Sequence, residues 1–153
     1  TKAEKKDYRE TREGMIDSYV HSDRIGVVVE VNCETDFVAR LPEFKEFAHQ
    51  IAMQIAAMAP KYSTVEDIPA EEYEAKKAEL LASDALNGKP AEMAEKIVEG
   101  QLKKHFAEQV LSEQTFVLDD SMTVEDRIKE QIAKSGENIR ISQFKRIELG
   151  VSE

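Results

Sequence analysis

The first regular pattern along the chain is an alternation of polar and apolar side chains that begins at Gly14. Such alternation is typical of a strand with one buried face. Turn-forming residues at positions 21–24 interrupt it, and over residues 25–33 every second side chain is again apolar. The side chains of that second apolar face are Ile25, Val27, Val29, Val31 and Cys33. We therefore predict a β-hairpin.

Beyond the hairpin, apolar residues fall three or four positions apart, which is the spacing of one face of a helix. We predict a short helical turn over residues 35–39 and a break near Leu41. A long helix then begins at Pro42 and stops before Pro60, because proline is tolerated only in a first helical turn. Its apolar face comprises Phe44, Phe47, Ala48, Ile51, Ala52, Ile55 and Met58. The break leaves residues 36–37 at a corner.

Three further helices are predicted downstream. One covers residues 70–86 and is closed by the Asn-Gly pair at 87–88. The next begins at Pro90, and the last runs from a capping box at 123–126 to a closing glycine, Gly136.

A final alternation covers residues 139–149, where Phe144 is out of phase, so we predict a bulge between Ser142 and Lys145. The predicted order is two strands, four helices and one strand. The fold class is therefore α+β, an antiparallel three-stranded sheet made of the β-hairpin and the C-terminal strand, packed with about four helices.

Charge and composition narrow the possible partners. The chain has 153 residues, and its 31 acidic against 21 basic side chains give a net charge of −10. A duplex-binding protein needs a basic face to displace counterions from phosphates, so no direct nucleic-acid partner is expected. No run approaches the roughly 20 apolar residues of a membrane helix, and residues 1–14 lack a secretory signal, so we expect an intracellular protein without a membrane partner.

The residues offer little for catalysis. The 3 histidines have no short ligand spacing such as HExxH, so neither a metal nor another cofactor is expected. Cys33 lies on the apolar face of its strand, where a buried, inert thiol is expected. Glu34 and Asp36 are close in sequence, but acids at a helix start usually complement the helix dipole. We expect a protein that is not an enzyme.

The segment from Asn32 to Arg40 stands apart, because an apolar strand ends in an acidic turn followed by an aromatic residue. On one interpretation, Phe37 and Val38 pack the following helix onto the sheet. On the other, Asp36 and Phe37 protrude and dock a partner, as exposed aromatic residues at rigid corners often do.

Short motifs recur along the chain in a fixed order: EGMI at 13–16, YVH and RIGV within 19–27, NCETDFVAR at 32–40, AMQIA at 52–56, PKY at 60–62, GKP at 88–90, AEKIVEG at 94–100 and GENI at 136–139. With these motifs, residues 14–150 resemble bacterial elongation factor Ts, the guanine-nucleotide exchange factor of the GTPase elongation factor Tu. The resemblance implies this activity and this partner. It also implies that residues 1–13 are a helical linker from a missing, ubiquitin-associated-like N-terminal domain, and that residues 14–153 are a single core and dimerisation domain of the short type.

In that family, the Asp and Phe of the TDFV motif enter the nucleotide domain of elongation factor Tu near its magnesium and phosphate site. The resemblance therefore implies that Asp36 and Phe37 bind the partner, with Val38 beside them. The family commonly has a polar cap where this chain has Leu41 and Pro42. This departure affects the angle at which the helix behind Phe37 begins.

Two further residues match partner-binding positions of the family. His21 matches a histidine that contacts another domain of the GTPase. In a short form, this histidine would act from the partner subunit. The alternative is that His21 is a solvated turn histidine. Gly136 matches a glycine in a loop that also meets the nucleotide domain, although Ser135 stands where isoleucine is usual.

Short relatives dimerise through their sheets, so the resemblance implies a homodimer in the cytoplasm of a bacterium, or in an organelle. Two alternatives of other classes remain at this point. One is a dimeric scaffold without exchange activity of its own. The other is a metal- or acid-dependent hydrolase built on Glu34, Asp36 and His21.

Overall fold

The computed structural model describes residues 9–152. Its contacts divide the chain into two compact units, Thr1–Ala59 with Gln114–Glu153, as far as these are described, and Pro60–Glu113. The assignment of residues 14–153 to one domain stays a prediction. Most of the expected helical linker lies outside the described residues, and residues 9–12 form no helix before the first strand begins at Glu13.

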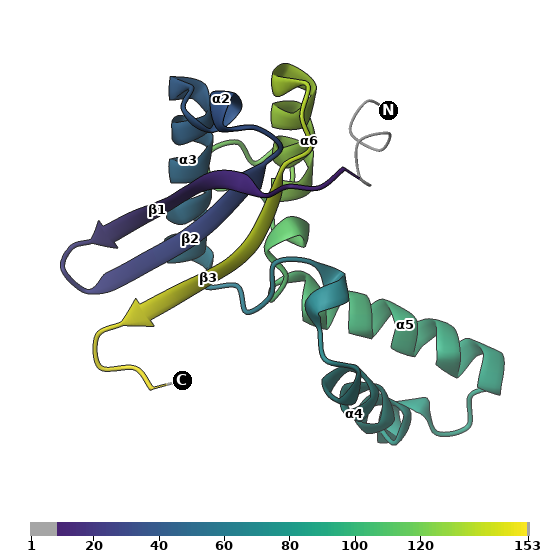
Figure 1. Cartoon of the computed structure of the whole chain (residues 1–153). Coiled ribbons are helices and arrows are strands. Elements are labelled where there is room, and N and C mark those ends of the chain that lie inside the picture. Colours follow the sequence, from purple (N-terminus) through teal and green to yellow (C-terminus); the bar gives the residue numbers. More distant parts are fainter. Residues whose placement is uncertain (1–8, 153) are drawn as a thin grey trace. The chain divides into compact units, whose positions relative to one another are not determined.

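The first unit contains a sheet of the three strands β1 (Glu13–His21), β2 (Ile25–Cys33) and β3 (Arg140–Glu148). The strand order is β1-β2-β3, and both pairs are antiparallel (Figure 1). The predicted α+β class, with a hairpin and a C-terminal strand in one sheet, is confirmed.

The connections of the sheet follow from local backbone geometry. Ser22 and Asp23 have φ values of 51° and 58°, and positive φ at both central residues defines the turn that suits twisted hairpin strands. On β2, Glu30 pairs with Gln143 whereas the next residue pairs with Ile141, so Ser142 is the extra residue of a bulge. This confirms the predicted irregularity.

Helices α2 (Asp36–Ala39) and α3 (Pro42–Met58) follow β2, and α3 covers one face of the sheet (Figure 1). The apolar side of α3 meets alternate residues of β2 in a core of fully buried side chains. These include Phe44, Phe47, Ile51, Ile55, Val29 and Val31. The open face of the sheet instead exposes large aliphatic side chains, namely Ile16, Val20, Val28 and Ile147.

Helix α6 (Val124–Ser135) begins at Thr123 with a capping box and ends at Gly136, whose φ of 76° is left-handed. Both ends agree with the sequence pattern. The helix packs on α3 through Arg127, whose guanidinium lies 4.9 Å above the ring of Phe47 and donates to Gln50 at 3.0 Å. Burial lowers the pKa of Arg127.

The second unit is helical and consists of α4 (Ala70–Leu81) and α5 (Ala91–Ala107), with 3₁₀ turns at Val65–Asp67, Asp84–Leu86 and Leu111–Glu113. The prediction of one helix over residues 70–86 was wrong at its end. The hydroxyl of Ser83 accepts from the amide of Ala85 at 3.3 Å and begins a separate 3₁₀ turn, a bond that competes with the helical one. Leu86 then enters the apolar core of this unit with Val98, Leu102, Phe106 and Val110. No described helix is long and apolar enough to cross a membrane.

Candidate partner-binding site

The corner after β2 is built around Thr35, the N-cap of α2. Its hydroxyl accepts from the amide of Val38 at 3.3 Å, and its carbonyl accepts from the amide of Ala39 at 3.2 Å. Val38 and Ala39 are buried and hold the short helix on the sheet, whereas Phe37 is 74% exposed. The interpretation in which both Phe37 and Val38 pack inward is therefore wrong for Phe37 and right for Val38.

Asp36 lies beside Phe37 in the first turn of α2 and is also exposed. Its carboxylate pairs with Arg40 at 2.9 Å across one turn of backbone. Both side chains reach into solvent, and exposed pairs of this kind contribute less than about 1 kcal/mol. The carboxylate of Asp36 is thus available to a partner at little cost.

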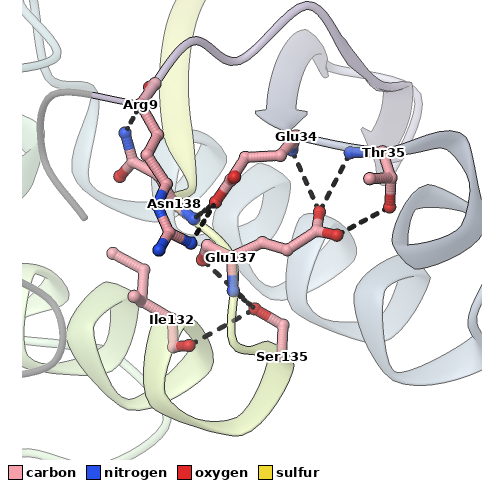
Figure 2. Close-up of polar contacts among 7 residues, drawn as sticks. All are labelled: Arg9, Glu34, Thr35, Ile132, Ser135, Glu137 and Asn138. Carbon is pink, nitrogen blue, oxygen red and sulfur yellow. Dashed lines mark hydrogen bonds and ion pairs between the residues drawn. The ribbon is translucent and has the colours of Figure 1, made fainter.

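The position of Thr35 is set by Glu137, which follows α6. One carboxylate oxygen of Glu137 accepts from the backbone amides of Glu34 and Thr35, each at 3.0 Å, and the other accepts from the Thr35 hydroxyl at 2.6 Å. Figure 2 shows this carboxylate pointing at the start of α2.

Glu34 makes the reverse connection. Its carboxylate accepts from the backbone amide of Asn138 at 2.5 Å and pairs with Arg9 at 3.6 Å (Figure 2). The side-chain amide of Asn138 in turn donates to the Arg9 carbonyl at 3.1 Å. We call the contacts among Arg9, Glu34, Thr35, Glu137 and Asn138 the carboxylate brace. It joins two loops that are 102 to 104 positions apart in the chain.

Gly136 belongs to the second of these loops, directly before Glu137. The neighbouring residue is Ser135, which has a polar side chain where isoleucine is usual in the family. Its hydroxyl donates to the Ile132 carbonyl at 3.4 Å and accepts from the Glu137 amide at 3.1 Å. The loop that carries Gly136 is therefore tied to the residues that precede Asp36 and Phe37.

His21 lies at the opposite end of the sheet. It pairs with Ile25 at the hairpin end, whereas Glu13 pairs with Cys33 at the α2 end. Eight strand steps separate the two ends, about 26 Å at the usual rise. His21 is exposed and its Nδ1 lies 2.7 Å from the Tyr19 hydroxyl. The fold brings together the loops of Asp36, Phe37, Val38 and Gly136 but not His21.

Comparison with known proteins identifies the family. The family model described as elongation factor Ts matches residues 2–151. This chain belongs to the elongation factor Ts family. It is 54% identical over 149 residues to elongation factor Ts of Thermotoga petrophila, which covers 97% of this chain and 74% of the relative. Elongation factor Ts of Coprothermobacter proteolyticus is 53% identical over 151 residues, with 97% and 76% covered. That of Carboxydothermus hydrogenoformans is 54% identical over 150 residues, with 97% and 69% covered.

The family assignment agrees with the absence of a convergent acid–base site at the residues of the hydrolase alternative. Glu34 is used in the carboxylate brace, Asp36 is exposed to solvent, and His21 is at the far end of the sheet. Within one chain, these three groups do not converge on one bond. The described chain therefore gives no support to the hydrolase interpretation.

Cys33 is fully buried, as expected from its place on the apolar face of its strand. Its thiol donates to the Thr35 carbonyl at 3.2 Å. Burial, with a smaller contribution from the charge of Glu137, raises the pKa of this thiol to about 11. The prediction of an inert thiol is confirmed in its burial, and the thiol adds one more bond to Thr35.

The sequence pattern does not reveal the roles of Glu137, Asn138 and Arg9. Glu137 and Asn138 lie inside the GENI motif, which drew attention only to Gly136. The sequence pattern predicts that Glu34 complements the helix dipole. Nothing in the sequence indicates that each acid caps the backbone of the other's loop, since such pairing depends on where the chain returns.

Proposed function

We propose that this chain accelerates the release of GDP from elongation factor Tu by inserting Asp36 and Phe37 beside the magnesium and phosphate site of the GTPase. Membership of the elongation factor Ts family supports the exchange activity and the partner. The proposal also includes action in the cytoplasm, where translation occurs in bacteria.

The observation that carries the proposal is the exposure of Phe37 on a corner whose neighbours are fixed. Phe37 is 74% exposed, and large aromatic side chains contribute much of the binding energy of protein interfaces. Val38 anchors the same short helix in the core, so Phe37 is presented without a large loss of order on binding. Asp36 adds a negative charge at the same place, and negative charge disturbs the coordination of Mg²⁺ and phosphate.

No covalent step is needed, because exchange follows from linked binding equilibria. If the chain lowers the affinity of the GTPase for GDP, then GDP lowers the affinity for the chain by the same free energy, about 1.4 kcal/mol for each tenfold change. A contact equally strong in both states would shift nothing. The chain therefore binds nucleotide-free elongation factor Tu more tightly than the GDP form.

The open face of the sheet supports a homodimer. Ile16, Val20, Val28 and Ile147 are exposed there on adjacent strands. A symmetric dimer buries the same patch of both subunits, and an exposed aliphatic face gains free energy when it is buried in this way. In such a dimer, His21 would contact the GTPase that is held by the other subunit.

The test of the exchange function is the release of a fluorescent GDP analogue from elongation factor Tu after mixing with excess GDP. We expect the release rate to rise with the concentration of this chain and to saturate. Binding of the chain to elongation factor Tu without any acceleration would contradict the proposal and would indicate the scaffold alternative.

A further inference from the structure

We propose that Glu137 and Glu34 are positioning residues, which act on the partner only through Phe37. The carboxylate brace holds the start of α2 in the orientation that presents Phe37 to the GTPase. This inference rests on the proposed exchange function and assigns to it two residues that do not themselves belong to the TDFV motif.

Helix α2 cannot hold its own position. It has 4 residues, and a helical turn of this length is unstable in water because fixing its backbone costs more than its hydrogen bonds return. Its start must therefore be held from outside. Glu137 does this by accepting from both backbone amides that precede the helix and from the Thr35 hydroxyl.

The two acids support one another despite their like charges. Each carboxylate accepts from the backbone of the loop that carries the other, and Arg9 lies 3.6 Å from Glu34. Hydrogen bonds to a charged acceptor are stronger than neutral ones. The reciprocal arrangement makes the α6–β3 loop and the β2–α2 corner one rigid unit (Figure 2).

Phe37 depends on this unit more than other residues of the corner do. Val38 and Ala39 are buried and stay anchored by the core, whereas Phe37 has no comparable burial. If the brace is lost, Phe37 samples more orientations, and ordering it again opposes binding. The loss appears in exchange activity rather than in the stability of the sheet.

The experiment is a double-mutant cycle read by GDP release per unit concentration of the chain. We expect Glu137→Ala to slow release about tenfold, which corresponds to about 1.4 kcal/mol. In the Phe37→Ala background, the same substitution should change release by less than about twofold, because its effect passes through Phe37. A role confined to general stability would slow release equally in both backgrounds.

Two further variants complete the cycle. Glu137→Gln should restore most of the activity, because its amide oxygen can accept from both backbone amides and its nitrogen can donate to the Thr35 hydroxyl. Glu125→Ala removes an exposed acid of α6 that pairs with Lys129 at 3.7 Å, and it should leave release unchanged. If Glu137→Ala does not fold, Glu137→Asn takes its place in the cycle, since its shorter side chain cannot span the three donors.

Amide hydrogen exchange of the free chain separates this inference from the proposed function. The Thr35 amide should be protected in the parent chain and lose protection in Glu137→Ala, while amides within α3 keep theirs. If the parent chain does not accelerate GDP release, the proposed function fails, whatever amide hydrogen exchange shows. If the parent chain accelerates release and Glu137→Ala matches it, or slows it equally in both Phe37 backgrounds, the inference is overturned.

Discussion

Truncation of Phe37 tests the central contact of the proposed exchange mechanism. In the free chain, Phe37→Ala removes a ring that is 74% exposed. Burying a whole phenylalanine side chain is worth about 1.5 to 3 kcal/mol. Only about a quarter of that is realised in the free chain, so we expect the free energy of unfolding to fall by about 0.4 to 0.8 kcal/mol.

The remaining three quarters, about 1 to 2 kcal/mol, becomes available when the ring is buried in the partner. If that energy is gained mainly in the nucleotide-free complex, its loss slows GDP release about 5-fold to 30-fold. We expect the parent chain and Phe37→Ala to have the same fold, so the difference in the rate of GDP release arises in the complex. Val38→Ala, by contrast, should lower stability as well as exchange, because Val38 is buried.

The assay follows a fluorescent GDP analogue leaving elongation factor Tu at several concentrations of the chain, with circular dichroism and thermal unfolding measured in parallel. Leu118→Ala is the matched control. Leu118 is 51% exposed. It follows Val117, whose amide donates to Gln54 in the second half of α3, away from α2. Unchanged release by Phe37→Ala, or slowing that is equal to that of Leu118→Ala, would refute the reasoning.

Three other substitutions give independent checks. Burial raises the pKa of the Cys33 thiol to about 11. The stability contributed by the protonated thiol is therefore complete below the pKa of the unfolded thiol and falls as the pH rises towards 11. In that pH range, the Tm of Cys33→Ala should decline less than the Tm of the parent chain. Gly14→Ala should cost about 1 to 3 kcal/mol in denaturant unfolding, because a Cβ at this φ of 147° would collide with the Val31 carbonyl of the paired strand. In sedimentation equilibrium, Ile147→Lys should shift the dimer towards monomer. Val151→Lys, which changes an exposed residue outside the strands, should not. A parent chain that is already monomeric at micromolar concentration would contradict the dimer.

Local patterns were sufficient for most of the secondary structure. The alternation of residues 25–33, the position of Pro42 and the capping box at Thr123 predicted elements that the structure contains within a residue or two. They succeeded because each depends on nearest neighbours, on the fixed φ of proline or on bonds within one turn. The helix predicted over residues 70–86 failed at Ser83, where a side-chain hydrogen bond competes with the helical one and the periodic pattern carries no information.

The candidate site was also predicted only in part from the sequence. The segment that carries Asp36 and Phe37 could be found from the sequence, because a buried strand that ends in acids and an aromatic residue is unusual in itself and because the motif resembles that of a known family. Its exposure could not be found, since Phe37 and Val38 are adjacent apolar residues and only the placement of α2 on the sheet decides which one is buried. The sequence by itself determined the family, most of the elements and the segment that we propose binds the partner. The tertiary structure alone decided that Glu34 and Glu137 meet, because a hydrogen bond between residues 102 to 104 positions apart exists only once β3 has returned to pair with β2.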